Sequence, residues 1–124
     1  MAGKTDLITK ANVLRTLAHH IGKRNGIKGE DLCGDIMDEA MDNVPTYIND
    51  HCMRKLRNAI QDARTEGSHI CGLPGEGYYM AENEKELIAT CKFLYSRAET
   101  TWIQIARMRG IALPDLKGQL KLPT

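Results

Sequence analysis

Hydrophobic residues recur at the three- and four-residue spacing of an amphipathic helix in four separate stretches of the chain. The first stretch follows Thr9, whose hydroxyl is suited to a helix N-cap, and we expect this helix to end at Gly22. Its predicted inward positions are Val13, Leu14, Leu17, Ala18 and Ile21. The adjacent His19 and His20 point in different directions on a helix, so we interpret them as ordinary histidines rather than metal ligands.

Acidic residues dominate the second stretch, which covers residues 27–41. Its predicted buried face contains Leu32, Cys33, Ile36, Met37 and Ala40, and carboxylates occupy the other face. A carboxylate cluster can bind a hard cation, but this one lacks the alternating oxygen ligands and the glycine of a calcium-binding loop. We therefore expect a solvated face that is unsuited to contact with phosphate.

The third stretch carries the most basic surface that the sequence offers. It begins after Pro45, with Thr46 or Asn49 as the N-cap, and ends at Gly67. Its predicted inward stripe is Cys52, Leu56, Ala59, Ile60 and Ala63. The residues left for the outside are His51, Arg54, Lys55, Arg57, Asn58 and Arg64.

A single β-hairpin is predicted over residues 70–80, between two helical stretches. A loop with three glycines and Pro74 separates two short runs of β-forming residues. A capping box of Asn83 and Glu86 then starts a long helix that we expect to reach Gly110. Residues 111–124 contain two prolines and a glycine, and we expect an extended tail there.

The order of these elements predicts the fold class. Three helices, a hairpin and a further helix give a mainly α protein with a small β-hairpin, in the order of a winged helix-turn-helix followed by a long C-terminal helix. The predicted organisation is a winged-helix domain over residues 1–82, a long helix over 83–110 and a tail over 111–124. In such a fold the third helix enters the major groove of DNA.

The run RKLRNAIQDARTEGSHICGLPGEGYYMAENEKEL resembles a pattern common in small phage and prophage proteins with winged-helix domains. The resemblance covers roughly residues 10–109: an Arg-rich helix, a glycine, an Ile before a short strand, then GYY and an acidic helix start. It implies DNA binding or transcription regulation. The hairpin loop departs from a phosphate-gripping wing, because it contains Glu76 and no Lys or Arg.

Two functions of different classes fit these features. The first is a DNA-binding regulator of a phage or prophage, which contacts double-stranded DNA through the third helix with Asn49, His51, Arg54, Lys55, Arg57 and Asn58. The second is a winged-helix protein-interaction module, such as a phage inhibitor of a host nuclease complex. The acidic second helix and Glu76 in the hairpin loop favour a protein partner.

The composition does not identify a binding partner, but it indicates where in the cell we expect the protein. The chain has 124 residues, with 17 basic and 16 acidic side chains and a net charge of +1, so only the clustering of charge can indicate a nucleic-acid surface. The first residues lack the apolar core of a signal peptide, and we expect a cytoplasmic protein of a bacterial host cell. The four cysteines form no CxxC pair, so we expect reduced thiols, no metal and no cofactor.

The long helix predicts self-association. Leu87, Cys91, Leu94, Ala98, Trp102 and Ile105 approach a 3-4 repeat, which favours a homodimer, although the same face could instead pack on its own domain. An enzyme is not expected, because the chain has no GxSxG, P-loop or HExxH motif. The one geometrically possible nucleophile pair is His69 and Cys71, which would share a face of a strand.

Overall fold

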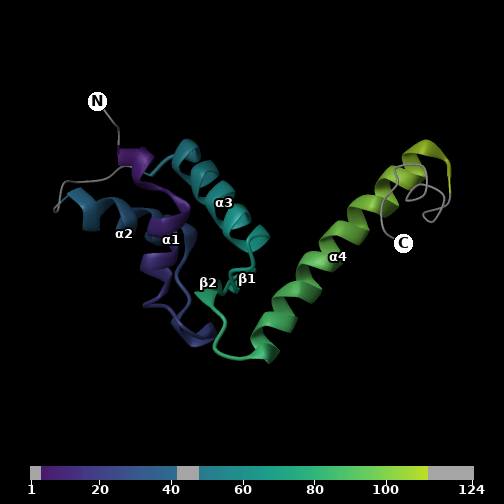
Figure 1. Cartoon of the computed structure of the whole chain (residues 1–124). Helices are drawn as coiled ribbons and strands as arrows, with labels where there is room; N and C mark the ends of the chain where they lie inside the picture. Colours follow the sequence, from purple (N-terminus) through teal and green to yellow (C-terminus); the bar gives the residue numbers. More distant parts are fainter. Residues whose placement is uncertain (1–3, 42–47, 112–124) are drawn as a thin grey trace. The chain divides into compact units, whose positions relative to one another are not determined.

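A computed structural model describes residues 4–41 and 48–111, and these residues are mainly helical with one small antiparallel sheet (Figure 1). The α-helices are α1 (Lys10–Leu17), α2 (Gly29–Met41), α3 (Asp50–Thr65) and α4 (Glu84–Arg109). The strands are β1 (Ile70–Leu73) and β2 (Gly77–Met80). Two short 3-10 helices, η1 (Lys4–Leu7) and η2 (Lys23–Asn25), precede and follow α1. The predicted fold of helices, one hairpin and a long C-terminal helix is confirmed at this level.

The chain divides into two compact units, residues 1–88 and residues 89–124. In the first unit α1, α2 and α3 pack on one another, and the hairpin follows the C-terminal end of α3 (Figure 1). The apolar stripes of the three helices meet in a single core that includes Ile70 of β1, and Tyr78 and Met80 of β2 pack against it. Its fully buried members include Val13, Leu17, Leu32, Leu56 and Ala63. Burial of each large aliphatic side chain contributes about 1.5–3 kcal/mol, so this shared core fixes the three helices together.

α1 is capped as predicted but ends earlier than predicted. The Thr9 hydroxyl accepts a hydrogen bond from the backbone N–H of Asn12 at 3.2 Å. The helix stops at Leu17 and not at Gly22, and Ile21 is 49% exposed rather than part of the inward stripe. The cause is non-local: the chain after α1 leaves the helix and pairs with β2. Ala18 is exposed as well, so the predictions of a helix through Gly22 and of inward positions at Ala18 and Ile21 are wrong.

α2 and α3 bury the predicted residues wherever the structure describes them. α2 buries Leu32, Cys33, Ile36 and Met37; the side chain of Ala40 lies outside the described residues. Asn49 is the N-cap of α3, and its side chain accepts a hydrogen bond from the Cys52 N–H at 3.0 Å. The other predicted cap, Thr46, lies outside the described residues. α3 ends just before Gly67, whose φ of 98° suits a residue without a side chain.

The hairpin is built around a tight turn. β1 and β2 pair antiparallel, with Ile70 opposite Met80 and Leu73 opposite Gly77. Between them Pro74 and Gly75 occupy the central positions of a type II turn, in which the Glu76 N–H donates to the Leu73 carbonyl at 3.0 Å. Gly75 has a φ of 81°, as the third position of this turn requires.

Two isolated backbone bridges, one on each side of η2, join the segment between α1 and α2 to the hairpin. Ile27 and Tyr78 exchange two backbone hydrogen bonds, of 2.9 and 2.7 Å. Met80 likewise accepts from Gly22 at 2.9 Å and donates to His20 at 2.8 Å. These bonds satisfy backbone groups along β2 that a two-stranded hairpin would leave open, and they explain why so small a sheet is stable.

α4 begins with a modified capping box. Asn83 accepts from the Glu86 N–H at 2.9 Å, as predicted. The Glu86 carboxylate reaches past Asn83 to the N–H of Glu82 at 2.9 Å and of Lys23 at 3.0 Å. The helix continues to Arg109, about 39 Å at about 1.5 Å per residue. Apart from Ile111, the predicted tail over 111–124 lies outside the described residues.

Within residues 4–41 and 48–111, no helix combines the length and the apolar character that a membrane crossing requires.

Candidate nucleic-acid interface

α3 presents a polar stripe opposite its buried face. Arg54, Asn58, Gln61 and Thr65 follow the i, i+4, i+7, i+11 spacing of one helix face, and all four are exposed. Arg57 is also exposed, beside this stripe. We call these five residues the α3 outer face. Because the buried stripe of α3 holds the helix against α1 and α2, the outer face is presented on a rigid element.

Sequence reasoning found only part of the outer face. It predicted Arg54, Arg57 and Asn58 and missed Gln61 and Thr65. The signal was available, because these two positions continue the helical spacing from Arg54. The prediction stayed in the N-terminal half of α3 because it was based on the basic residues and their neighbours.

Two basic residues of α3 are engaged elsewhere. The Lys55 ammonium donates to the Thr5 carbonyl at 3.1 Å and forms an ion pair with Asp6 at 3.0 Å. The Arg64 guanidinium donates to the Ile70 carbonyl at 2.9 Å, at the start of β1, and Arg64 is only partly exposed. The prediction that Arg64 lies on the outside is therefore wrong. Lys55 is half-buried against η1, so it is not a free cation.

The two remaining predicted residues lie at the start of α3. Both Asn49 and His51 are exposed. The Asn49 side-chain oxygen is already used as the helix cap, which leaves its amide N–H groups for any further contact. His51 can donate from a ring nitrogen to a phosphate or a base.

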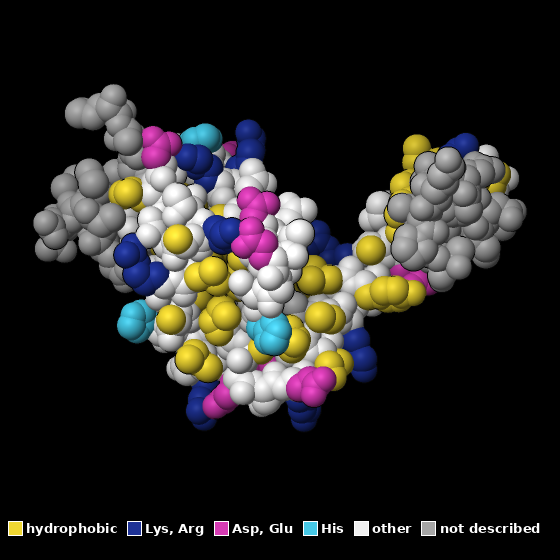
Figure 2. All heavy atoms as spheres, viewed as in Figure 1, with side chains coloured by type: hydrophobic (Ala, Val, Ile, Leu, Met, Phe, Trp, Pro, Cys, Tyr) yellow, Lys and Arg dark blue, Asp and Glu magenta, His cyan; other side chains and the backbone are white. Residues whose placement is uncertain are grey.

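Arg54 and Arg57 are the uncommitted cations of α3. Neither forms an ion pair with a residue that the structure describes. Asp50 and Asp62 are exposed on the same helix, so the local net charge is small. Figure 2 shows one face of the molecule, on which Lys and Arg side chains of the first unit are scattered among acidic ones rather than gathered. A phosphate contact made by α3 therefore involves few residues.

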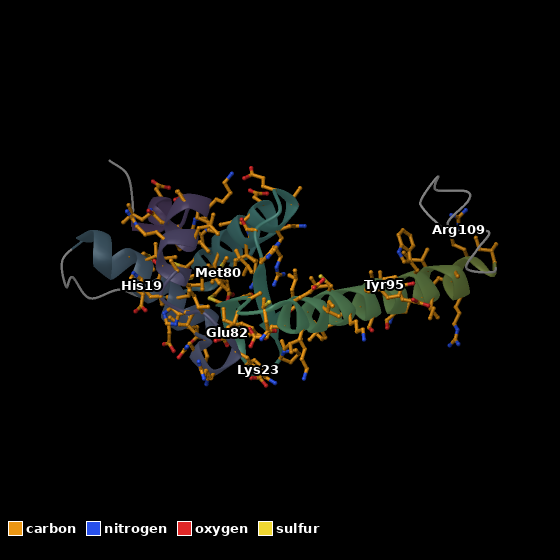
Figure 3. All side chains as sticks on the ribbon, turned by 60° about the horizontal axis from the view of Figure 1, so that its bottom comes forward. His19, Lys23, Met80, Glu82, Tyr95 and Arg109 are labelled. Carbon is orange, nitrogen blue, oxygen red and sulfur yellow. The ribbon has the colours of Figure 1, made fainter. Side chains whose placement is uncertain are left out.

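The described turn of the hairpin, residues 73–77, contains no Lys or Arg. Glu76 lies 3.5 Å from the Lys23 ammonium, and Arg24 pairs with Glu82 at 3.5 Å. The turn is pressed against the α1–α2 connection so closely that a Cβ on Gly26 would lie 2.1 Å from the Glu76 carbonyl oxygen. Figure 3 labels Lys23 and Glu82 in this region. Salt bridges and backbone contacts to its own domain therefore hold the hairpin in place.

The possible nucleophile pair does not form a reactive site. His69 is exposed and precedes β1. Cys71 is fully buried, and its thiol donates to the Glu86 carbonyl at 3.6 Å. A substrate would have no access to that sulfur.

The surroundings of Cys33 favour its protonated thiol. Burial, together with the neighbouring Cys52 and Glu30, raises the pKa of the Cys33 thiol to about 11, so it is protonated at neutral pH. No group of three or more metal-binding side chains gathers among the residues in ranges 4–41 and 48–111. All four cysteines are free thiols, and Cys91 alone among them is exposed.

The predicted dimerisation residues share one face of α4. Cys91, Leu94 and Ala98 are exposed, whereas Leu87, Trp102 and Ile105 are half-buried. The face also includes Ile88 and Tyr95, which are 46% and 64% exposed. A broad apolar surface of the helix is therefore open to solvent in the single chain.

Comparison with known proteins gives no relative: no family model, curated protein or solved structure matches this chain.

Proposed function

We propose that the first unit is a winged helix-turn-helix that binds double-stranded DNA through the α3 outer face. The observation that carries the proposal is the position of this face. It lies on the helix directly before a hairpin, it points away from the core, and its two arginines have no ion-pair partner among the described residues.

The pairing of β2 supports the winged-helix assignment. Gly22 and Ile27, from the connection between α1 and α2, bond to Met80 and Tyr78 of β2. These bonds hold the hairpin that follows α3 against its own domain, as a small wing requires.

The chemistry of the outer face suits base edges as well as phosphates. Arginine donates two parallel hydrogen bonds to guanine, and Asn or Gln can both donate to and accept from adenine. Arg54, Asn58 and Gln61 place these groups on successive turns of one helix. Arg57 lies to one side, where it suits a phosphate contact.

The proposal assigns the hairpin a supporting role. Because Glu76 is paired with Lys23, a strand of DNA meets no free positive charge at the turn. We therefore expect weak non-specific binding with a shallow salt dependence, and specificity that depends on α3. The phage or prophage origin that the sequence resemblance implies stays a prediction.

A protein-interaction module is the second candidate. The observation that favours it is the exposed acidic surface of α2, where Glu30, Asp31 and Asp35 face solvent. Such a surface repels a phosphate backbone and attracts a basic protein. A phage inhibitor of a host nuclease complex is one example of this class.

A fluorescence anisotropy titration of labelled duplex DNA tests the proposal. We expect the protein to bind random duplex at low salt and Arg54→Ala to weaken that binding by roughly one order of magnitude, as loss of a charged contact predicts. Arg15→Ala removes the same charge from α1, which lies outside the α3 outer face, and should bind like the parent protein. No binding at low salt, or equal losses in both variants, would contradict the proposal and favour the interaction module.

A further inference from the structure

The exposed apolar face of α4 needs a partner. Ile88, Leu94 and Tyr95 are 46%, 36% and 64% exposed, and Cys91 and Ala98 lie between them on the same face. Figure 2 shows hydrophobic side chains at the surface along this helix. The side that carries Ser96 and Thr100 is more polar, although Phe93 and Ile103 also lie on it. Exposed apolar surface of this extent marks an interaction site.

The spacing of the face matches a coiled coil. Steps of four and three residues, repeated without a break, connect Glu84, Ile88, Cys91, Tyr95, Ala98, Trp102, Ile105 and Arg109. We call these eight positions the α4 seam. A strict alternation of this kind keeps one stripe in contact with a partner helix over its whole length.

A neighbouring stripe is a poorer seam. It replaces Tyr95 and Trp102 by Leu94 and Thr101, and the Thr101 hydroxyl is polar and bonded to the Arg97 carbonyl at 3.0 Å. Leu87, Leu94 and Met108 then flank the α4 seam and widen it.

We propose that α4 binds α4 of a second copy in antiparallel orientation, with the middle of the contact between residues 96 and 97. In that register Ile88 faces the partner's Ile105, Cys91 faces the partner's Trp102, and Tyr95 faces the partner's Ala98. Glu84 at one end then meets the partner's Arg109. Figure 3 shows Tyr95 midway along α4 and Arg109 at its end.

Side-chain size supports this register. The two bulkiest seam residues, Trp102 and Tyr95, each face a small one, Cys91 or Ala98, and the isoleucines face each other. Large side chains set against small ones fill a core without overlap. A parallel pair in register would set Trp102 against the partner's Trp102 and leave a gap at Ala98.

Charge supports the same orientation. Antiparallel pairing joins Glu84 to the partner's Arg109 at both ends of the contact, whereas parallel pairing sets each beside its own like charge. Lys92 and Glu99 flank the seam on one side, and antiparallel packing brings Lys92 beside the partner's Glu99. The chain thus presents a self-complementary pattern, which an isologous dimer requires.

The inference goes beyond DNA binding and does not depend on it. The partner is a second copy of this chain, and the dimer forms whatever the α3 outer face contacts.

Sedimentation equilibrium of the full chain tests whether the dimer exists. We expect a monomer–dimer equilibrium in the parent protein and a rise of more than about hundredfold in the dissociation constant for Ala98→Glu, which buries an unpaired carboxylate. Ser96→Glu adds the same charge on the opposite side of α4 and should leave the equilibrium unchanged. Circular dichroism confirms that each variant is folded. A parent protein that stays monomeric at all concentrations, or an Ala98→Glu variant that still dimerises, would overturn the proposal.

Charge reversal tests the register. Lys92→Glu and Glu99→Lys each create two like-charged contacts per dimer, and we expect each to weaken the homodimer several-fold. A mixture of the two variants restores both opposite-charge contacts, so it should form a heterodimer at parental strength. Failure of the mixture to associate better than either variant alone would refute this register.

Disulfide formation tests the orientation. In the antiparallel dimer the two Cys91 residues lie about eleven residues, or about 16 Å, apart along the axis, too far for a disulfide. Mild oxidation should therefore leave the parent protein uncrosslinked, whereas Trp102→Cys should crosslink to the partner's Cys91. Trp102→Ser is the matched control and should not crosslink. Rapid crosslinking of the parent protein through Cys91 would indicate a parallel dimer and contradict the proposal.

Discussion

Two neighbouring basic residues of α3 make different contacts, and this difference decides which of them is available to bind a ligand. Arg54 and Lys55 are neighbours on α3, yet Arg54 forms no ion pair with a described residue, whereas Lys55 is bound to Asp6 and the Thr5 carbonyl. Charge alone could not separate them in the sequence. The partner of Lys55 lies about fifty residues earlier, and its proximity is a product of the fold.

The cysteines allow a prediction at this scale. Cys33, Cys52 and Cys71 are buried, and the raised pKa of Cys33 keeps its thiol protonated at neutral pH. In the folded monomer we expect only Cys91 to react rapidly with a thiol reagent such as DTNB, with the other three reacting after unfolding. Cys91→Ser should abolish the fast phase. A fast phase that survives this substitution would contradict the burial of the other thiols.

Glu86 provides a prediction about pH. Hydrogen bonds from the backbone N–H groups of Glu82 and Lys23 lower the pKa of its carboxyl from the ordinary value of 4.5. Because the folded pKa lies below the unfolded one, the stabilisation is present above about pH 4.5 and is lost as the pH falls through the folded pKa.

Thermal unfolding as a function of pH measures this effect. We expect Glu86→Gln to have a lower Tm than the parent protein at neutral pH, and the difference to shrink below pH 4.5. Asp31→Asn removes a carboxylate from the first turn of α2 and serves as the control. A Tm difference that stays constant through the acid range would show that the carboxylate is not the source of stability.

At the scale of elements, local signals predicted more than long-range ones could. The N-caps Thr9, Asn49 and Asn83 were predictable because a cap and its helix are adjacent in the sequence. The end of α1 was not, because Ile21 leaves the helical pattern to pair with Met80 nearly sixty residues later. Apolar periodicity is the same whether a residue continues a helix or joins a sheet edge.

Two glycines of the hairpin, Gly75 and Gly77, should differ in how much a substitution destabilises the fold. Gly77 has a φ of 75°, and a Cβ there would lie 2.6 Å from the Ile27 carbonyl oxygen. Gly75 has a similar φ of 81° but no atom within 4 Å of its Cβ position. We expect Gly75→Ala to cost about 1 kcal/mol of unfolding free energy from backbone strain alone, and Gly77→Ala to cost clearly more. Urea unfolding of both variants makes the comparison, and equal losses would contradict the close packing of β2 on Ile27.

In the molecule as a whole, the sequence correctly predicted which side of α3 faces outward, but not which residues are available there. The inward stripe was predicted correctly, since the buried residues follow from the helical period. The outward set was predicted only in part. Arg64 donates a hydrogen bond to the Ile70 carbonyl, and Lys55 donates one to the Thr5 carbonyl of η1. Both contacts arise from the tertiary structure, so a local sequence pattern does not predict them.

Two interfaces then define the molecule that we propose. We propose that the α3 outer face contacts DNA and that the α4 seam contacts a second copy. The two interfaces can be tested separately, because the residues of one lie on α3 and those of the other on α4. Each can therefore be removed while the other is measured.

The salt dependence of DNA binding tests the central claim most directly. Log Kd for a random duplex is measured against log salt for the parent protein and for the double variant Arg54→Ala/Arg57→Ala. Because Arg57 is assigned to a phosphate and Arg54 to a base edge, we expect the slope for the double variant to be smaller by about 0.9, the value for one lost phosphate contact. We also expect the preference for one DNA sequence to be lost. Equal slopes together with equal affinities for every duplex tested would contradict the assignment of α3 as the DNA-binding helix.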